Sequence, residues 1–170
     1  MKLIKGDRLP DAKVFVLEKD PKEVSIKEII GEDKVIIFGL PGAFTPTCSV
    51  KHLPGFINAT EEIKKKGIKK ILCISVNDPF VMNAWGKIHN VGNKILMVGD
   101  YNATFTQNIG AEVNLHRRGL GIRSSRYSML VEKGIIVKIK EEETAGTCES
   151  TAAENFIFNC SAISLFLLCS

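Results

Sequence analysis

Residues 35–48 read VIIFGLPGAFTPTC, and this stretch sets the expected fold. Its first six residues, 35–40, are apolar or glycine throughout, which is typical of a β-strand buried on both faces of a sheet. Thr45 is a good helix N-cap residue and Pro46 suits the first helical position, so a helix is expected to begin there. A buried strand that leads into a helix predicts an α/β domain.

The rest of the chain continues this alternation of strand-like and helix-like segments. Further strands are expected at residues 12–17, 71–76 and 95–98, and a hairpin at 127–132 and 135–139 across Lys133-Gly134. Helices are expected at residues 25–30, behind a capping box, and at 45–66, 78–89, 103–109 and from 152 onward. No internal repeat or linker interrupts the pattern, so a single domain over residues 1–170 is expected.

The composition excludes several classes of protein. The chain has 170 residues, 45% of them hydrophobic, and a net charge of +4. Basic and acidic residues are interleaved, so the charge gives no reason to expect a nucleic-acid partner. The five cysteines form no CxxC pair and no cluster at zinc-ligand spacing, so neither a metal nor a disulfide framework is expected. Without a secretory signal, a reducing compartment is expected, cytoplasmic in the simplest case, with an organellar form left open.

The C-terminal segment, residues 152–170, is atypical because residues 156–168 are almost all apolar. It is shorter than the 18–20 apolar residues or so that a membrane-spanning helix needs, so no membrane partner is expected. A helix packed on the domain or on a dimer mate is the first interpretation. An incorrect or disordered gene end and, more distantly, a tail anchor are the alternatives.

Cys48 falls in the first turn of the predicted helix, where free N–H groups and the helix dipole favour a thiolate. A free thiol has a pKa of about 8.5, so only a few per cent of it is ionised at pH 7. One helix end contributes about 0.3–2 kcal/mol, less than the roughly 3 kcal/mol that a mostly ionised thiol requires. The Thr45 hydroxyl and an arginine brought in by the fold are the candidates for the missing donors. The alternative is that Cys48 is an inert, buried, small hydrophobic residue.

Three separated motifs resemble those of one enzyme family. The first is PGAFTPTCS at residues 41–49, followed by HLPGF at 52–56. The second is CISVNDPFV at 73–81 with Trp85-Gly86, and the third is GLGIRSSRYSM at 119–129. Together they resemble the peroxiredoxin-5 (type II) subfamily of peroxiredoxins, over roughly residues 6–140 and in the right order. The resemblance implies a thioredoxin-like fold, with a central mixed sheet flanked by helices, and a thiol-dependent peroxidase that reduces hydrogen peroxide and alkyl hydroperoxides.

The same resemblance assigns roles to individual side chains. Cys48 becomes the peroxidatic cysteine, and Thr45 hydrogen-bonds its thiolate and the peroxide. Pro41 shields the sulfur from water. Arg126 corresponds to the arginine that orients the peroxide and favours the thiolate, with Arg123 as a weaker alternative for that role. No metal, flavin or haem is required.

The sulfenic acid that peroxide leaves on Cys48 must be reduced again. The resemblance allows glutaredoxin with glutathione, or thioredoxin, as the reductant. Cys148 is the candidate resolving cysteine, since it follows Gly146-Thr147 where animal relatives carry one. The residues after it, 149–154, are more similar to the bacterial and plant type, which lacks a resolving cysteine. A homodimer is expected because relatives often pair near the active-site helix.

Several other residues carry less specific signals. His52, four residues after Cys48, is either a base or, more simply, a hydrogen-bonded structural histidine. Cys73 and Trp85 lie in patterns that predict core packing. Cys160 and Cys169 lie in the apolar tail. Two other functions are the alternatives. A thiol-disulfide oxidoreductase is disfavoured because the chain has no CxxC motif. A non-catalytic thioredoxin-like binding or redox-sensing module is disfavoured because it would not need Pro41, Thr45, Cys48 and Arg126 together.

Overall fold

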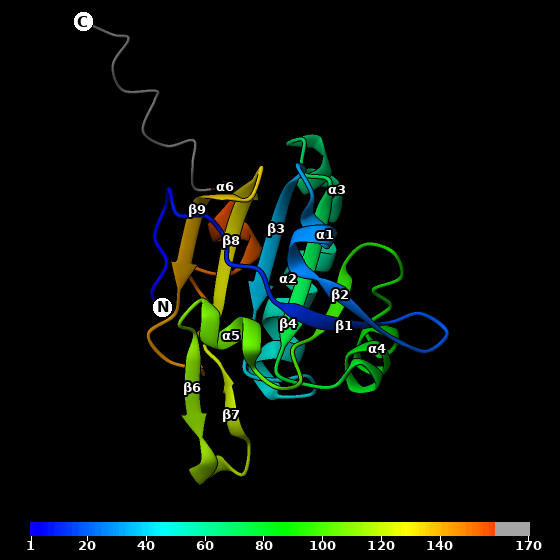
Figure 1. The fold of residues 1–170 in the computed structure, drawn as a ribbon, viewed down its shortest axis with the longest axis vertical. Helices are drawn as coiled ribbons and strands as arrows, with labels where there is room; N and C mark the ends of the chain where they lie inside the picture. The colour runs from blue at the N-terminus through cyan, green and yellow to red at the C-terminus, as the bar shows by residue number, and fades with distance from the viewer. Residues whose placement is uncertain (159–170) are drawn as a thin grey trace, which may run out of the picture.

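A seven-stranded sheet crosses the middle of the molecule in the computed structural model, which describes residues 1–158 (Figure 1). Its strands are β1 (Lys13–Leu17), β2 (Pro21–Ser25), β3 (Lys34–Gly39), β4 (Lys70–Ser75), β5 (Leu96–Gly99), β8 (Tyr127–Glu132) and β9 (Ile135–Glu141). They lie in the order β2-β1-β5-β4-β3-β8-β9. The pairs β3–β4 and β4–β5 are parallel and the other pairs are antiparallel, so the sheet is mixed, as predicted.

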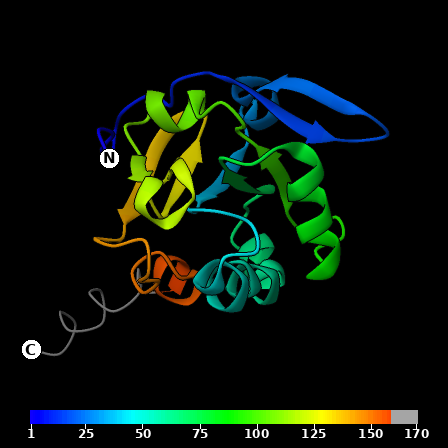
Figure 2. The same cartoon turned by 90° about the horizontal axis from the view of Figure 1, so that it is seen from below.

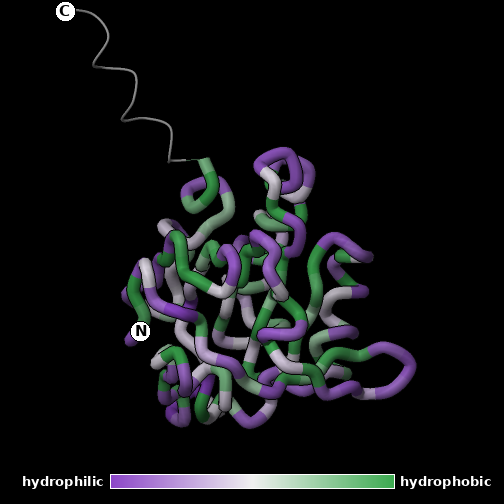
Figure 3. The backbone as a smooth tube through the Cα atoms, turned by 45° about the horizontal axis from the view of Figure 1, so that its top comes forward, coloured by the Kyte–Doolittle hydropathy of each residue, from purple (hydrophilic) through white to green (hydrophobic). Residues whose placement is uncertain are grey.

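Helices cover both faces of this sheet (Figure 2). They are α1 (Ile26–Ile30), α2 (Leu53–Asn58), α3 (Thr60–Lys65), α4 (Pro79–Ile88), α5 (Thr104–Asn108) and α6 (Ala153–Phe158). Successive side chains of β3 point to opposite faces. Val35 and Ile37 join the hydrophobic cluster that contains residues of α1 and α5, whereas Ile36 and Phe38 join the cluster that contains residues of α2, α3, α4 and α6. Figure 3 shows hydrophobic chain along the inner strands and a hydrophilic loop between β1 and β2.

The structure confirms two predicted helix starts and one predicted turn. The Ser25 hydroxyl accepts from the Glu28 amide while the Glu28 carboxylate accepts from the Ser25 amide, which completes the capping box of α1. The Asp78 carboxylate caps α4 by accepting from the Val81 amide. Lys133 and Gly134 both have positive φ, +51° and +73°, as a tight turn between β8 and β9 requires.

The prediction of one long helix from residue 45 to residue 66 is wrong in its detail. The chain is helical from Pro46, but Cys48–His52 form a π-helical turn in which the Leu53 amide bonds to the Cys48 carbonyl. Pro54 explains the wider turn, because a proline inside a helix lacks an N–H and its ring clashes with the carbonyl four residues back. A second interruption at Ala59 separates α2 from α3.

Three strands were not predicted. The edge strand β2 has mostly exposed polar residues, and a two-stranded ribbon of β6 (Glu112–Leu115) and β7 (Gly121–Ser124) stands apart from the main sheet. The 3₁₀ turn His116–Arg118 joins the two strands of the ribbon. The predicted C-terminal helix begins as α6, but residues 159–170, with Cys160 and Cys169, lie outside the described residues. Within residues 1–158, no helix combines the length and hydrophobicity needed to cross a bilayer.

Candidate active site

Cys48 lies at the carboxyl end of β3, on the π-helical turn that follows the loop 41–45. Its side chain is completely buried, with 0% of its surface exposed. The neighbouring Ser49 hydroxyl accepts a hydrogen bond of 3.1 Å from the Trp85 indole, so α4 holds this turn in place. Trp85 is itself buried, as predicted for a packing residue. The end of a buried strand and the start of a helix is a common place for a binding site in α/β proteins.

Arg126 reaches the Cys48 sulfur, although 78 residues separate the two in sequence. Strand β8 pairs with β3 so that Tyr127 stands opposite Gly39, and this places Arg126 at the end of β3. A side chain at Gly39 would put its Cβ 2.1 Å from the Tyr127 ring, so glycine permits this close pairing. The Arg126 Nη2 donates to Cys48 Sγ at 3.3 Å.

The buried Arg126 guanidinium is surrounded by neutral acceptors and by this one sulfur. It is 1% exposed, and it also donates to the carbonyls of Thr147 and Ala145 and to His52 Nδ1, at 2.8, 2.9 and 3.1 Å. Within residues 1–158, no ion pair joins Arg126 to a carboxylate. A buried cation is costly unless an anion lies near it. A negatively charged sulfur at Cys48 would supply that anion.

His52 orients Arg126 and is held by the backbone on its other side. Because the guanidinium only donates, the His52 Nδ1 must accept, so the ring proton sits on Nε2 and is directed at the Thr151 carbonyl, 3.3 Å away. Burial and, to a smaller extent, the Arg126 charge lower the pKa of His52 to about 3. The neutral ring has no free acceptor for the Cys48 proton, which favours the structural interpretation over a base.

The neutral state of His52 predicts an acid-sensitive fold. Between pH 6.5 and 3 the unfolded chain takes up a proton at this residue that the folded protein does not, so stability rises with pH through this window and is lost as pH falls. From pH 7 to pH 4 the loss is roughly 3 kcal/mol from this residue alone. Urea unfolding at both pH values should show a smaller loss in His52→Gln than in wild type. Exposed His116→Gln is the control, and equal pH dependence in all three proteins would contradict the prediction.

The loop 41–45 is held from two sides. The Arg123 guanidinium donates to the Pro41 carbonyl at 3.2 Å, and its Nε donates to the Leu120 carbonyl at 2.8 Å. The Thr45 hydroxyl donates to the Gly42 carbonyl at 2.7 Å and so closes the turn before the helix. Of the two arginines considered from sequence, the structure therefore places Arg126 against the sulfur and Arg123 against the Pro41 backbone.

Cys148 lies in the loop 142–152, which Arg126 also contacts. Its thiol is 3% exposed, and burial raises its pKa. A groove of about 500 Å³ runs between this loop and the start of the Cys48 helix, and Cys148 and Thr47 both line it. The Thr47 hydroxyl bonds to the Gly146 carbonyl at 3.2 Å, which ties the two walls of the groove together. The three cysteines in the described residues, Cys48, Cys73 and Cys148, are all free thiols.

Cys73 is part of the core, as predicted. It lies in β4 opposite Phe38 of β3 and is completely buried. Burial raises the pKa of this thiol well above its usual range, with the neighbouring Cys48 acting in the same direction. A thiol in that state is a poor nucleophile.

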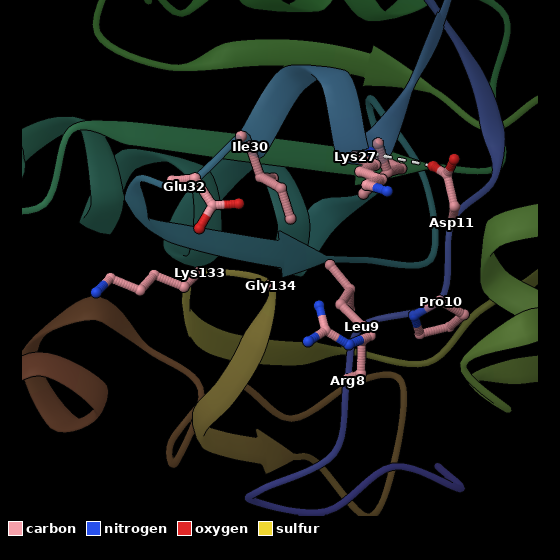
Figure 4. Close-up of a pocket in the computed structure, with 11 residues that line it drawn as sticks. Arg8, Leu9, Pro10, Asp11, Lys27, Ile30, Glu32, Lys133 and Gly134 are labelled. Carbon is pink, nitrogen blue, oxygen red and sulfur yellow. Dashed lines mark hydrogen bonds between the residues drawn. The ribbon is translucent and has the colours of Figure 1, made fainter.

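Within residues 1–158, no group of three or more His, Cys, Asp or Glu side chains could hold a metal ion. A cavity of about 410 Å³ lies at the opposite end of β3, between α1 and the β8–β9 turn (Figure 4). It is lined by Arg8, Lys27 and Lys133 among others, and none of its lining residues contacts Cys48.

Sequence reasoning missed the residues that support this site from behind. The Asn77 side chain accepts from the Ala43 amide at 3.0 Å and so anchors the loop 41–45. Ser128 donates to the Thr151 carbonyl at 2.8 Å, and the Glu142 carboxylate binds residues 149–151. Asn77 lies just beyond the end of the buried strand β4, which is a usable signal, whereas nothing in the sequence pattern around Glu142 distinguishes that residue.

The chain is similar to known proteins over most of its length. The Redoxin family matches residues 4–157. Peroxiredoxin-2D from Arabidopsis thaliana is 44% identical over 154 residues, which is 89% of this chain and 94% of the relative. Reduced Prx3 from Vibrio vulnificus, solved in complex with H₂O₂, superposes with a TM-score of 0.85 at 38% identity, covering 91% of this chain and 96% of the other. Peroxiredoxin 5 from Alvinella pompejana gives 0.77 at 34%, over 83% of this chain and 90% of the other.

The mixed sheet and its flanking helices are thus the thioredoxin-like fold of these neighbours, as the sequence resemblance implied. The relatives and the solved structures are peroxiredoxins at 34–44% identity over most of both chains. We conclude that this chain belongs to the Redoxin family and is a peroxiredoxin, a thiol-dependent peroxidase.

Proposed function

We propose that Cys48 is the nucleophile that reduces hydrogen peroxide and alkyl hydroperoxides, with Arg126, Thr45 and Pro41 completing the site. One observation carries the assignment. The Arg126 guanidinium is buried without a carboxylate partner among residues 1–158 and donates to the Cys48 sulfur at 3.3 Å. A fixed cation at that position stabilises a thiolate and can also attract the peroxide oxygens.

In the proposed reaction the Cys48 thiolate attacks the terminal oxygen of the hydroperoxide. The S–O bond forms as the O–O bond breaks, sulfur gives up two electrons, and the leaving oxygen takes a proton to become water or an alcohol. Negative charge moves from the sulfur to the leaving oxygen, so donors that do not move stabilise the transition state. Arg123 binds the Pro41 carbonyl and Thr45 binds the Gly42 carbonyl, and this fixed loop supports the proposal that Pro41 shields the sulfur from water and that Thr45 binds the peroxide.

Stopped-flow mixing of the reduced protein with hydrogen peroxide tests this proposal directly. We expect rapid consumption of one equivalent of peroxide, and mass spectrometry should find the added oxygen, trapped as a sulfenic acid adduct, on Cys48. Peroxide consumption no faster than that of a small free thiol would reject the proposal, as would oxygen found on Cys73 or Cys148 in place of Cys48.

The reductant that restores Cys48 is proposed to be glutaredoxin with glutathione, or thioredoxin. The groove that Cys148 lines opens beside the start of the Cys48 helix, and it offers Lys51 and Glu149 as charged contacts for a thiol-bearing partner. Comparing turnover with each reductant at equal concentration distinguishes them, since only the physiological class should support repeated cycles.

Cys148 is the candidate resolving cysteine, and its substitution gives a defined result. If Cys148 attacks the sulfenic acid of Cys48, Cys148→Ser should lose turnover with thioredoxin while its first reaction with peroxide stays unchanged. The thiol is buried and its pKa is raised, so the loop 142–152 must open before it can react. Steady-state assays with thioredoxin measure the effect, and unchanged turnover in Cys148→Ser would show that another thiol performs this step.

We also propose that the protein forms a homodimer through the face that carries the Cys48 turn. Phe44, Val50 and Phe80 are large hydrophobic residues with exposed side chains. They belong to adjacent segments, since Asn77 binds the loop before Phe44 and Trp85 binds Ser49. Sedimentation velocity of wild type and Phe80→Glu distinguishes the dimer from the monomer. A monomeric wild type at micromolar concentration would exclude the dimer.

A further inference from the structure

The Glu142 carboxylate organises the segment behind the active site. One of its oxygens, Oε1, accepts four hydrogen bonds: from the amides of Glu149 and Thr151 at 2.8 and 2.9 Å, and from the hydroxyls of Ser150 and Thr151 at 3.2 and 2.9 Å. Burial raises the pKa of Glu142, but the hydrogen bonds from the Thr151 and Glu149 amides and from the Thr151 and Ser150 hydroxyls together lower it, and the net shift is downward. The side chain therefore stays ionised, and it fixes Thr151 in space.

Thr151 in turn supports the active site through its carbonyl. That oxygen lies 3.3 Å from His52 Nε2 and accepts from the Ser128 hydroxyl at 2.8 Å. A carbonyl at this place selects the His52 tautomer that carries its proton on Nε2. Only this neutral tautomer leaves Nδ1 free to accept from Arg126, 3.1 Å away.

Arg126 and Glu142 bind different parts of the loop 142–152. Arg126 donates to the Ala145 and Thr147 carbonyls, whereas Glu142 accepts from donors of residues 149–151. The Glu142 amide also donates to the Arg126 carbonyl at 2.9 Å, so the two residues are joined through their backbones as well. The carboxylate charge additionally opposes the lowering of the His52 pKa, although burial and Arg126 dominate.

We propose that Glu142 is a positioning residue for peroxide reduction: it holds the Thr151 carbonyl, which fixes His52, which holds the Arg126 guanidinium on the Cys48 sulfur. The inference rests on the proposed roles of Cys48 and Arg126. Glu142 contacts neither sulfur nor substrate, so its substitution changes the rate only through the geometry of Arg126. A guanidinium displaced by a fraction of an ångström loses part of its effect on the reacting atoms.

The test measures the rate at which reduced protein reacts with hydrogen peroxide. Glu142→Ala should react about tenfold more slowly, because displacement of a positioning group costs rate without touching the reacting atoms. Glu142→Gln keeps an acceptor oxygen and should recover most of that loss. Glu143→Ala is the matched control, since it removes an exposed carboxylate at the next position and should react like wild type.

A double-mutant cycle separates this role from general destabilisation. If Glu142 acts through His52, adding Glu142→Ala to His52→Gln should slow the reaction little further, whereas independent effects would multiply. Side-chain ¹⁵N NMR should show His52 as the Nε2–H tautomer in wild type and as a mixture in Glu142→Ala. Multiplying rate losses, or a rate loss with the wild-type tautomer retained, would overturn the proposal.

Thr151→Val is a second variant that tests the same contact. If Glu142→Ala does not fold, Thr151→Val removes one of the four donors and leaves the carboxylate in place, and it should shift the His52 tautomer in the same direction. An unshifted tautomer and wild-type rate in that variant would overturn the proposal. Failure of the underlying function is distinguishable, because wild type itself would then react with peroxide no faster than Cys48→Ser.

Discussion

Cys48→Ser should consume peroxide no faster than buffer, a loss on the order of 1,000-fold or more for removal of the nucleophile. A serine hydroxyl is a far weaker acid than a thiol, so the Arg126 guanidinium cannot hold it as an anion at neutral pH. The reaction with hydrogen peroxide, followed by stopped-flow fluorescence of the neighbouring Trp85, measures the loss.

The control for this variant is another buried thiol. Cys73→Ala removes a sulfur from the adjacent strand β4 and should leave the rate nearly unchanged, because Arg126 makes no hydrogen bond to it. Both variants should keep the far-UV circular dichroism of wild type. Substantial peroxide reduction by Cys48→Ser would place the nucleophile elsewhere in the chain.

Arg126→Gln is expected to slow the reaction with peroxide by about 100-fold to 1,000-fold, the usual cost of removing a preorganised charged donor. Arg126→Lys should recover only part of the rate. An ammonium keeps the charge, but it cannot bond to the sulfur, to His52 and to two carbonyls at once as the planar guanidinium does.

The same substitution should also lower stability. The buried His52 Nδ1 loses its donor, and a buried acceptor left unpaired costs about 1–3 kcal/mol. Rate constants and urea unfolding of Arg126→Gln, Arg126→Lys and the exposed control Arg118→Gln separate the two effects. If Arg126→Gln reacts within tenfold of wild type, the guanidinium does not stabilise the transition state.

The parts of the fold that the sequence predicted are those with a local physical signal. The apolar run at residues 35–40 is typical of a buried strand, Asp78-Pro79 favours the start of a helix, and Lys133-Gly134 favours a tight hairpin turn. Strand β2 escaped prediction because it lies at an edge and carries Pro, Lys and Glu, which strands usually avoid. The widened turn at Cys48–His52 escaped it because Thr45 and Pro46 signalled a regular helix.

The candidate site divides in the same way. Cys48 and its helix start could be argued from adjacent residues, but the approach of Arg126 depends on the pairing of β3 with β8, which no spacing reveals. The resemblance to known motifs predicted Arg126, whereas the residues around Cys48 predicted only that some arginine lies near the sulfur. The hydrogen bonds that residues 142–151 make to the site could not be predicted, because they are single contacts between a loop and side chains and leave no periodic pattern in the sequence.

The wider helical turn has a consequence for how this enzyme can vary. In this turn the Leu53 amide bonds to the Cys48 carbonyl. The turn places both Cys48 and His52 against the Arg126 guanidinium, with Cys48 Sγ at 3.3 Å and His52 Nδ1 at 3.1 Å. The residue that imposes this spacing, Pro54, never meets the sulfur. A substitution at Pro54 is expected to shift Cys48 and His52 relative to the guanidinium, and so to change reactivity while every side chain that contacts the guanidinium keeps its identity.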